Sequence, residues 1–239
     1  LHKLRGQFGF AIFDSLENTV FLARDRVGIK PLYYSLNKKN LIFSSELKTI
    51  EQSGTLDFEP NYDSYVAYMR HLCVPGDQTG NKNVFKLEPG QYALINNDAK
   101  IYKKTYWDPF QIQINNDLTE DEAINRVEDL LIQSVEYRKV SDVEVGLFLS
   151  GGLDSSLIGK LMKENDESKI KSFNIDYEDH FEGYQGEVEE ARFASSEIGV
   201  ELVEDRISYH DFKQIIDNYS FFQDDLVGDE VGIPLYFLG

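Results

Sequence analysis

The 239-residue sequence has little cysteine, no long apolar run and no excess of basic side chains. Its only cysteine is Cys73, which excludes a disulfide framework and a cysteine-based zinc site and favours a reducing compartment. No stretch approaches the roughly 18 consecutive apolar residues that a membrane-spanning helix needs. The net charge of −18 argues against nucleic acid or an anionic membrane as the main partner. We therefore expect a cytoplasmic protein that binds neither nucleic acid nor a membrane.

The negative charge is concentrated in one part of the chain. Residues 175–230 carry 17 of the 42 acidic side chains but only 3 of the 24 basic ones. Solvated helix faces would account for most of this excess, and the alternative is that a few of the carboxylates hold a cation. Hydrophobic residues make up 41% of the chain, which is enough for a sizeable core.

Both ends of the sequence have the apolar character of chain interiors. Residues after Leu1 enter a strand pattern almost at once, and residues 233–238 resemble the start of a helix with Pro234 in its first turn. Neither end has the polar taper of a natural terminus. We therefore expect an internal fragment of a longer protein.

The residue pattern changes near residue 115, which predicts domains at 1–114 and 115–239. The first region reads as mostly β, with alternating apolar positions such as Phe8, Phe10 and Ile12. In the second, Thr119 and Glu122 predict a capping box at a helix start. Ile124, Val127, Leu131 and Val135 then fall on one apolar face of that helix. Strands and helices then alternate, with strands expected at 143–149, 171–175 and 201–206 and helices at 154–164, 187–198 and 210–221. This order implies a parallel sheet with crossover helices.

The strongest chemical signal is the string Ser-Gly-Gly-Leu-Asp-Ser-Ser at residues 150–156, between an expected strand and helix. Gly151 and Gly152 allow a sharp turn and a close approach of the backbone to a ligand. The helix start supplies free N–H groups, which form an anion site. Asp154 suits a Mg²⁺ ion that bridges it to phosphate. The string is neither a Walker A motif nor a Rossmann fingerprint, and the structural alternative is an ordinary turn with Asp154 as a cap.

Several separated blocks resemble, in the same order, the glutamine-dependent asparagine synthetase family. They lie at residues 5–14, 24–34, 43–48, 74–76 and 87–90, followed by the glycine loop at 150–156. The resemblance implies an α+β part, residues 1–114, which would be part of a class II glutaminase domain of the Ntn αββα type. It also implies an α/β part, residues 115–239, with the parallel sheet of the PP-loop ATP pyrophosphatases (adenine nucleotide alpha hydrolase-like).

The resemblance also implies an activity. Such ligases use ATP to adenylate a carboxylate, most simply aspartate through aspartyl-AMP, and ammonia from glutamine hydrolysis then forms the amide. Two alternatives stay open: a relative that amidates another carboxylate, such as a surface-polysaccharide sugar acid, and a non-catalytic nucleotide-binding fragment. The family's glutaminase nucleophile is an N-terminal cysteine, so with Leu1 this fragment alone is expected to be inactive as a glutaminase. A homodimer is left open as well.

Individual roles follow from the same resemblance. ATP would be bound by eight residues, which are Leu149, Ser150, Gly151, Gly152, Asp154, Ser155, Ser156 and Ile175. Asp154 and Asp229 would be Mg²⁺ ligands, and Asp225 would be an active-site carboxylate. Three departures from the family pattern leave the acceptor open: Asp225-Leu226 replaces a Glu-Pro pair, Asp176 stands where glycine is common, and Gly186-Glu187 stands where an Asp-Glu pair is common.

Overall fold

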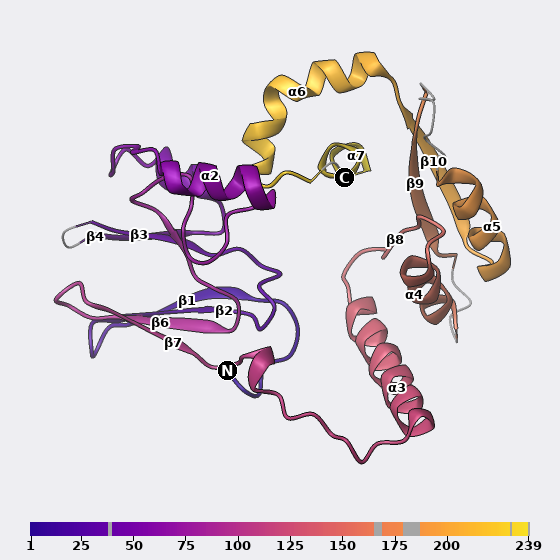
Figure 1. The fold of residues 1–239 in the computed structure, drawn as a ribbon, viewed down its shortest axis with the longest axis horizontal. Coiled ribbons are helices and arrows are strands. Elements are labelled where there is room, and N and C mark those ends of the chain that lie inside the picture. Colours follow the sequence, from indigo (N-terminus) through magenta and orange to yellow (C-terminus); the bar gives the residue numbers. More distant parts are fainter. Residues whose placement is uncertain (38–39, 165–168, 179–186, 230, 239) are drawn as a thin grey trace. The chain divides into compact units, whose positions relative to one another are not determined.

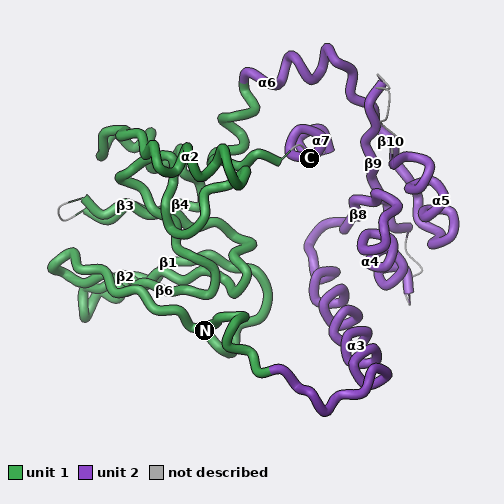
Figure 2. Tube along the Cα trace, viewed as in Figure 1, with its two compact units in different colours: residues 1–113, 218–229 green, residues 114–217, 230–239 purple. Residues whose placement is uncertain are grey.

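The computed structural model describes residues 1–37, 40–164, 169–178, 187–229 and 231–238. It divides into two compact units, one of residues 1–113 with 218–229 and one of residues 114–217 with 230–239 (Figure 2). The chain therefore returns to the first unit late in the sequence. The predicted domain limits, 1–114 and 115–239, do not anticipate this return and stay a prediction. Within the described residues, every helix is too short or too polar to cross a bilayer.

The first unit contains two antiparallel sheets (Figure 1). One has the order β1-β2-β6-β7 and consists of Gly9–Asp14, Thr19–Arg24, Gln91–Ile95 and Ile101–Thr105. The other has the order β4-β3-β5 and consists of Asn40–Ser44, Tyr33–Asn37 and Phe85–Lys86. Leu22 and Ala93 from the first sheet share one buried cluster with Tyr34 from the second. The two sheets therefore form adjoining layers with a common core.

Residues 1–113 of the first unit also form three short helices, α1 (Leu47–Glu51), α2 (Tyr62–His71) and the 3₁₀ turn Pro109–Gln111. Helix α1 buries Leu47 and Ile50 against Tyr33 of strand β3. Tyr33 and Tyr34 are consecutive and so point to opposite faces of their sheet. This alternation lets one strand contribute to the core between the sheets and to the core beneath α1.

The second unit alternates strands and helices, as expected. After α3 (Glu120–Lys139) the elements are β8 (Leu147–Phe148), α4 (Leu153–Lys163), β9 (Lys171–Tyr177), α5 (Val188–Ile198), β10 (Glu201–Ile207), α6 (Tyr209–Gln223) and α7 (Gly232–Leu238). From residue 218 on, α6 belongs to the first unit. The strands pair in the order β10-β9-β8, and both pairs are parallel. The expected parallel sheet is confirmed, although the strand expected at 143–149 is only two residues long.

Helix α3 has the expected capping box, but its expected apolar face is buried only in part. The capping box is present, because Glu122 N donates to Thr119 Oγ1 at 3.3 Å and Thr119 N donates to Glu122 Oε2 at 2.9 Å. The predicted apolar face of the helix is buried only toward its C-terminal end. Val135 is buried in the core of the unit, whereas Ile124 and Val127 are more than half exposed. Only the C-terminal half of this helix packs against the core of its own unit.

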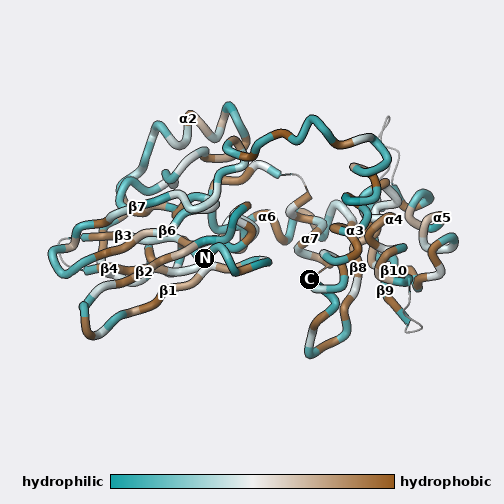
Figure 3. The backbone as a smooth tube through the Cα atoms, turned by 90° about the horizontal axis from the view of Figure 1, so that it is seen from below, coloured by the Kyte–Doolittle hydropathy of each residue, from teal (hydrophilic) through white to brown (hydrophobic). Residues whose placement is uncertain are grey.

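The core of the second unit lies between the sheet and helices α3, α4 and α5. Its buried members are Val135, Leu147, Leu149, Leu161, Met162, Ile170, Ala191, Ala194 and Val200. Figure 3 shows hydrophobic stretches along strands such as β1 and β2 in the first unit and β8 and β10 in the second. Leu147 and Leu149 are buried in this core, so the loop after β8 starts from a packed strand end.

Candidate functional site

The glycine loop follows β8 directly and is held by its own serine hydroxyls. Leu149 N donates to Phe173 O at 2.9 Å, which extends the pairing of β8 with β9 by one residue. The Oγ atoms of Ser150 and Ser155 lie 3.0 Å apart. Gly152 N donates to Ser150 Oγ at 3.3 Å, and Ser155 Oγ donates to Gly152 O at 3.2 Å. These bonds close the loop into a tight turn between strand and helix.

Helix α4 begins with backbone N–H groups that have no acceptor among the described residues. Its N-cap is Gly152, which has no side chain to cap the helix. The first intrahelical bond is donated by Ser156 N to Gly152 O at 3.0 Å. The N–H groups of Leu153, Asp154 and Ser155 come before that bond, as they do at any uncapped helix start. Free donors together with the positive end of the helix dipole favour a bound anion such as phosphate.

Helix α5 packs so closely against the loop that position 151 has to be glycine. The φ of Gly151, +80°, is in the left-handed region that side chains rarely adopt. An added Cβ atom would lie 2.4 Å from the carbonyl carbon of Glu190 and 2.6 Å from Ala191 N, both in the backbone of α5. The sequence interpretation attributed the glycine pair to a close approach by a ligand. The structure shows that the atoms closest to Gly151 are those of α5.

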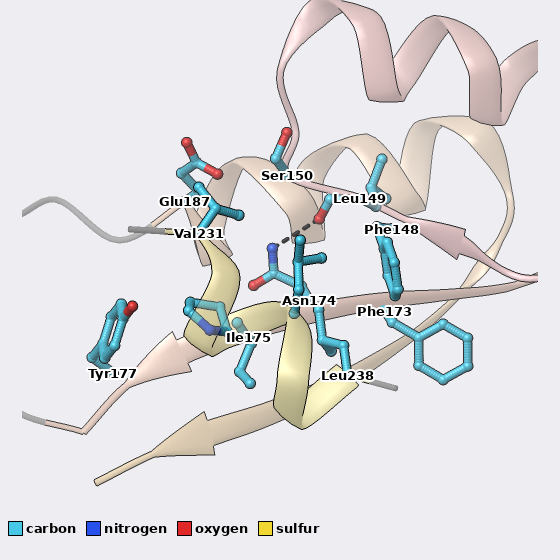
Figure 4. Close-up of a pocket in the computed structure, with 12 residues that line it drawn as sticks. Phe148, Leu149, Ser150, Phe173, Asn174, Ile175, Tyr177, Glu187, Val231 and Leu238 are labelled. Atoms are coloured by element: carbon cyan, nitrogen blue, oxygen red, sulfur yellow. Dashed lines mark hydrogen bonds between the residues drawn. The ribbon is translucent and has the colours of Figure 1, made fainter. Parts of the chain in front are cut away.

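A cavity of about 560 Å³ lies beside the loop in the second unit (Figure 4). Three residues expected to bind a nucleotide line it, namely Leu149, Ser150 and Ile175. The rest of its wall comes from Phe148, Phe173, Asn174, Tyr177, Glu187, Val231, Pro234, Leu235 and Leu238. The wall is mostly apolar with a few polar groups, which is the usual make-up of a small-molecule site. It lies where β8 and β9 end, at the sheet edge where parallel sheets bind ligands.

Sequence reasoning missed Asn174. The residue is 7% exposed, and its Nδ2 donates to Leu149 O at 2.8 Å. Its Oδ1 is buried and has no hydrogen-bond donor among the described residues. Asp176 and Ser156 likewise each have a buried oxygen without such a partner in that part of the chain. The only signal in the sequence was a polar residue between Phe173 and Ile175 in a strand expected to be buried.

The structure places Asp224 and Asp225 in the first unit. The two carboxylate oxygens of Asp224 accept hydrogen bonds from Leu47 N and Lys48 N at the start of α1. Asp225 Oδ2 accepts from Tyr33 OH at 3.1 Å and from Lys86 Nζ at 3.2 Å. Burial, and after it the charge of Asp225, raises the pKa of the Tyr33 hydroxyl. Both carboxylates therefore hold residues 218–229 on the first unit.

Further backbone contacts fix the same segment. Gly228 N donates to Leu72 O at 2.7 Å, and Val227 forms an antiparallel bridge with Cys73, which is exposed. Asp229 ends the segment in the first unit, whereas Asp154 is part of the second. In the described ranges no cluster of three or more His, Cys, Asp or Glu side chains could hold a metal ion. The active-site role of Asp225 and the metal roles of Asp154 and Asp229 stay predictions.

Comparison with known proteins matches two consecutive parts of the chain to two family models. The family model described as glutamine amidotransferase domain matches residues 1–107, and the one described as asparagine synthase matches residues 126–239. The glutamine-hydrolysing asparagine synthetase 1 of Bacillus subtilis (strain 168) is 34% identical over 99% of the chain, and asparagine synthetase 2 of the same strain is 34% identical over 68%. Amidase chry2 of Gibberella zeae is 32% identical over 68%. The chain spans 36%, 23% and 24% of these three relatives.

Proposed function

Because the chain belongs to the family of glutamine-hydrolysing asparagine synthetases, we propose that the full-length protein is an ATP-dependent ligase that makes an amide from a carboxylate. Glutamine would be hydrolysed in the domain that contains the first unit and would supply the ammonia. The second unit would bind ATP and adenylate the carboxylate. The chain spans about a third of the B. subtilis relative, so the activity is proposed for the whole protein.

The fold supports a finer assignment for each unit. Two adjoining antiparallel sheets with helices are consistent with part of an Ntn-type αββα glutaminase. A parallel sheet whose first strand leads through Ser-Gly-Gly-Leu-Asp-Ser-Ser into a helix is consistent with a PP-loop ATP pyrophosphatase. We therefore extend the family assignment to these two fold types.

The observation that carries the proposal is the glycine loop: its Ser150 lines the cavity, and it leads into backbone N–H groups at the start of α4 that have no acceptor among the described residues. The N–H groups of Leu153 and Ser155 and the hydroxyls in the loop would bind the phosphates of ATP, and Leu149 and Ile175 would flank the adenosine. The residues present fit this ligand, because the helix start attracts anions and the cavity wall is largely apolar. Preorganised donors of this kind stabilise charge that develops on phosphate oxygens.

A Mg²⁺ ion would fit beside the proposed phosphate position, with the carboxylate of Asp154 as its protein ligand. The carboxylate of Asp154 is exposed in the first turn of α4, next to the proposed phosphate position. Mg²⁺ typically binds one or two protein carboxylates together with phosphate oxygens, so a single carboxylate from this loop is sufficient. When bound, the ion would neutralise phosphate charge. Asp229 is proposed as a second ligand on the sequence resemblance alone.

The acceptor is proposed to be aspartate, the simplest reading of the family name. A second candidate is another small carboxylate, because the same chain also resembles a protein named amidase chry2. A non-catalytic nucleotide-binding role is the third candidate. A cytoplasmic location rests on the low cysteine content, and a homodimer has no support beyond the resemblance, so both stay predictions.

The test of the proposal is ATP–pyrophosphate exchange with the full-length protein. We expect exchange that depends on aspartate or, failing that, on one member of a panel of related acids. Asp154→Asn should abolish it while leaving the unfolding temperature unchanged. The matched control is Asp129→Asn, on the exposed surface of α3, which should exchange as the wild type does. Absence of exchange with every acid would refute the proposal, and full activity in the Asp154 variant would refute the role of that carboxylate.

A further inference from the structure

Asn174 lies on β9, in the wall of the cavity beside the glycine loop, and its carboxamide has one occupied and one unoccupied end. The Nδ2 atom donates to Leu149 O at 2.8 Å, whereas Oδ1 is buried without a donor among the described residues. Figure 4 shows the nitrogen turned toward Leu149 and the oxygen on the other side of the carboxamide. A carbonyl can only accept a hydrogen bond, so Leu149 O determines which end of the carboxamide faces it.

The orientation of this carboxamide has a physical consequence. Asn174 is buried, with 7% of the residue exposed, and a buried acceptor that receives no hydrogen bond is unfavourable. Such a group in a cavity wall is satisfied when a ligand brings a donor to it. Its neighbours in the wall, Leu149 and Ile175, have apolar side chains. The carboxamide of Asn174 is therefore one of the few polar groups in this part of the wall.

We propose that Asn174 is a specificity-determining residue of the nucleotide site, and that its Oδ1 accepts a hydrogen bond from an N–H or O–H donor of the bound nucleoside. This inference rests on the proposed function, since it requires that the cavity holds the nucleoside part of ATP. The same side chain has a second task, which is to fix the Leu149 carbonyl at the point where β8 enters the loop. One residue thus connects the shape of the loop with recognition of the nucleoside.

The donor belongs to one of two groups on the nucleoside. The exocyclic amine of adenine and the ribose hydroxyls can both donate a hydrogen bond to a carboxamide oxygen. Three analogues of ATP, each lacking one possible donor, show which group donates. Purine riboside triphosphate lacks the amine, 2′-deoxy-ATP lacks one hydroxyl and 3′-deoxy-ATP lacks the other. A lost hydrogen bond that leaves a buried acceptor empty typically weakens binding by about tenfold.

The experiment measures the dissociation constants of ATP and of the three analogues with the full-length protein. We expect one analogue to bind the wild type about tenfold more weakly than ATP does, and this difference to vanish in Asn174→Ala. The matched control is Ser172→Ala, which alters the same face of β9 at a fully buried residue outside the cavity wall. The Ser172→Ala variant should retain the wild-type difference in affinity between ATP and the weakly bound analogue. A residue that only supported the fold would weaken all four nucleotides equally.

Two results overturn the inference. The first is a wild type that binds all three analogues as tightly as ATP, and this measurement does not require any variant to fold. The second is discrimination that persists unchanged in Asn174→Ala, or in the similarly sized Asn174→Leu if the alanine variant does not fold. A wild type that binds no nucleotide at all would instead refute the proposed function, and it would refute the inference as well.

Discussion

Replacing Gly151 with alanine tests the packing of the glycine loop against helix α5. Gly151 has a φ of +80°, and an alanine Cβ at this position would lie 2.4 Å from the carbonyl carbon of Glu190. Gly199, at the end of α5, has nearly the same φ of +79°, but an added Cβ there meets no atom within 4 Å. The two glycines therefore share the backbone strain and differ only in the contact.

The expected magnitudes follow from these two features. A left-handed conformation costs an alanine about 1–2 kcal/mol, so Gly199→Ala should lower the free energy of unfolding by that amount. Ordinary contacts of a Cβ atom begin near 3.4 Å, so the loop and the backbone of α5 would have to separate by about 1 Å in Gly151→Ala. Overpacking of this kind adds about 1–3 kcal/mol. The total for Gly151→Ala is then about 2–5 kcal/mol.

The assay is denaturant unfolding of both variants beside the wild type, together with ATP binding. Gly151→Ala should lose more stability than Gly199→Ala and should also weaken ATP binding, because the loop that it displaces leads into the free donors of α4. Gly199→Ala should bind ATP as the wild type does. Equal losses of stability in the two variants would refute the inferred contact between loop and helix.

Two further predictions concern carboxylates of the first unit. Asp25 is buried, and although burial opposes ionisation, hydrogen bonds from Lys30 N, Ile29 N and Phe8 N outweigh it and lower its pKa. Its contribution to stability is therefore complete above the ordinary value of 3.8 and is lost as the pH falls through the lower folded pKa. Asp25→Asn should remove this part of the pH dependence in unfolding measurements between pH ~2 and ~5, and an unchanged profile would contradict it. Asp225→Asn should lower the pKa of Tyr33, because the charge of Asp225 raises it, although burial should keep it above 10.0. An NMR titration that follows the assigned ring signal of Tyr33 checks this: ionisation of Tyr33 should begin at a lower pH in the variant than in the wild type.

Much of the fold could be predicted because its signals are local. The capping box of Thr119 and Glu122 needs only four consecutive residues, and the structure contains it. The alternation of strands and helices after residue 115 likewise predicted a parallel sheet. The strand expected at 143–149 was too long, because an apolar run shows burial but not how many residues find a partner strand. Helix α3 differs for the same reason, since its apolar pattern extends beyond the surface on which it packs.

The candidate site was predicted in part. Leu149, Ser150 and Ile175 lie in one cavity wall, as their positions at the ends of strands suggested. The hydrogen bond from Tyr33 to Asp225 joins residues 192 positions apart, and no local pattern could indicate it. Asn174 escaped notice because its importance depends on which of its two polar ends is already bonded.

The sequence by itself determined the family, the glycine loop and the order of the elements, because each is written in neighbouring residues or in short blocks. Only the tertiary structure decided why Gly151 must be glycine, where the Asp224–Asp225 pair binds and which atom of Asn174 has no donor in the part of the chain that the structure describes. These three features depend on atoms brought together from distant parts of the chain. Packing and the pairing of buried polar groups choose those contacts, and neither is encoded within one segment.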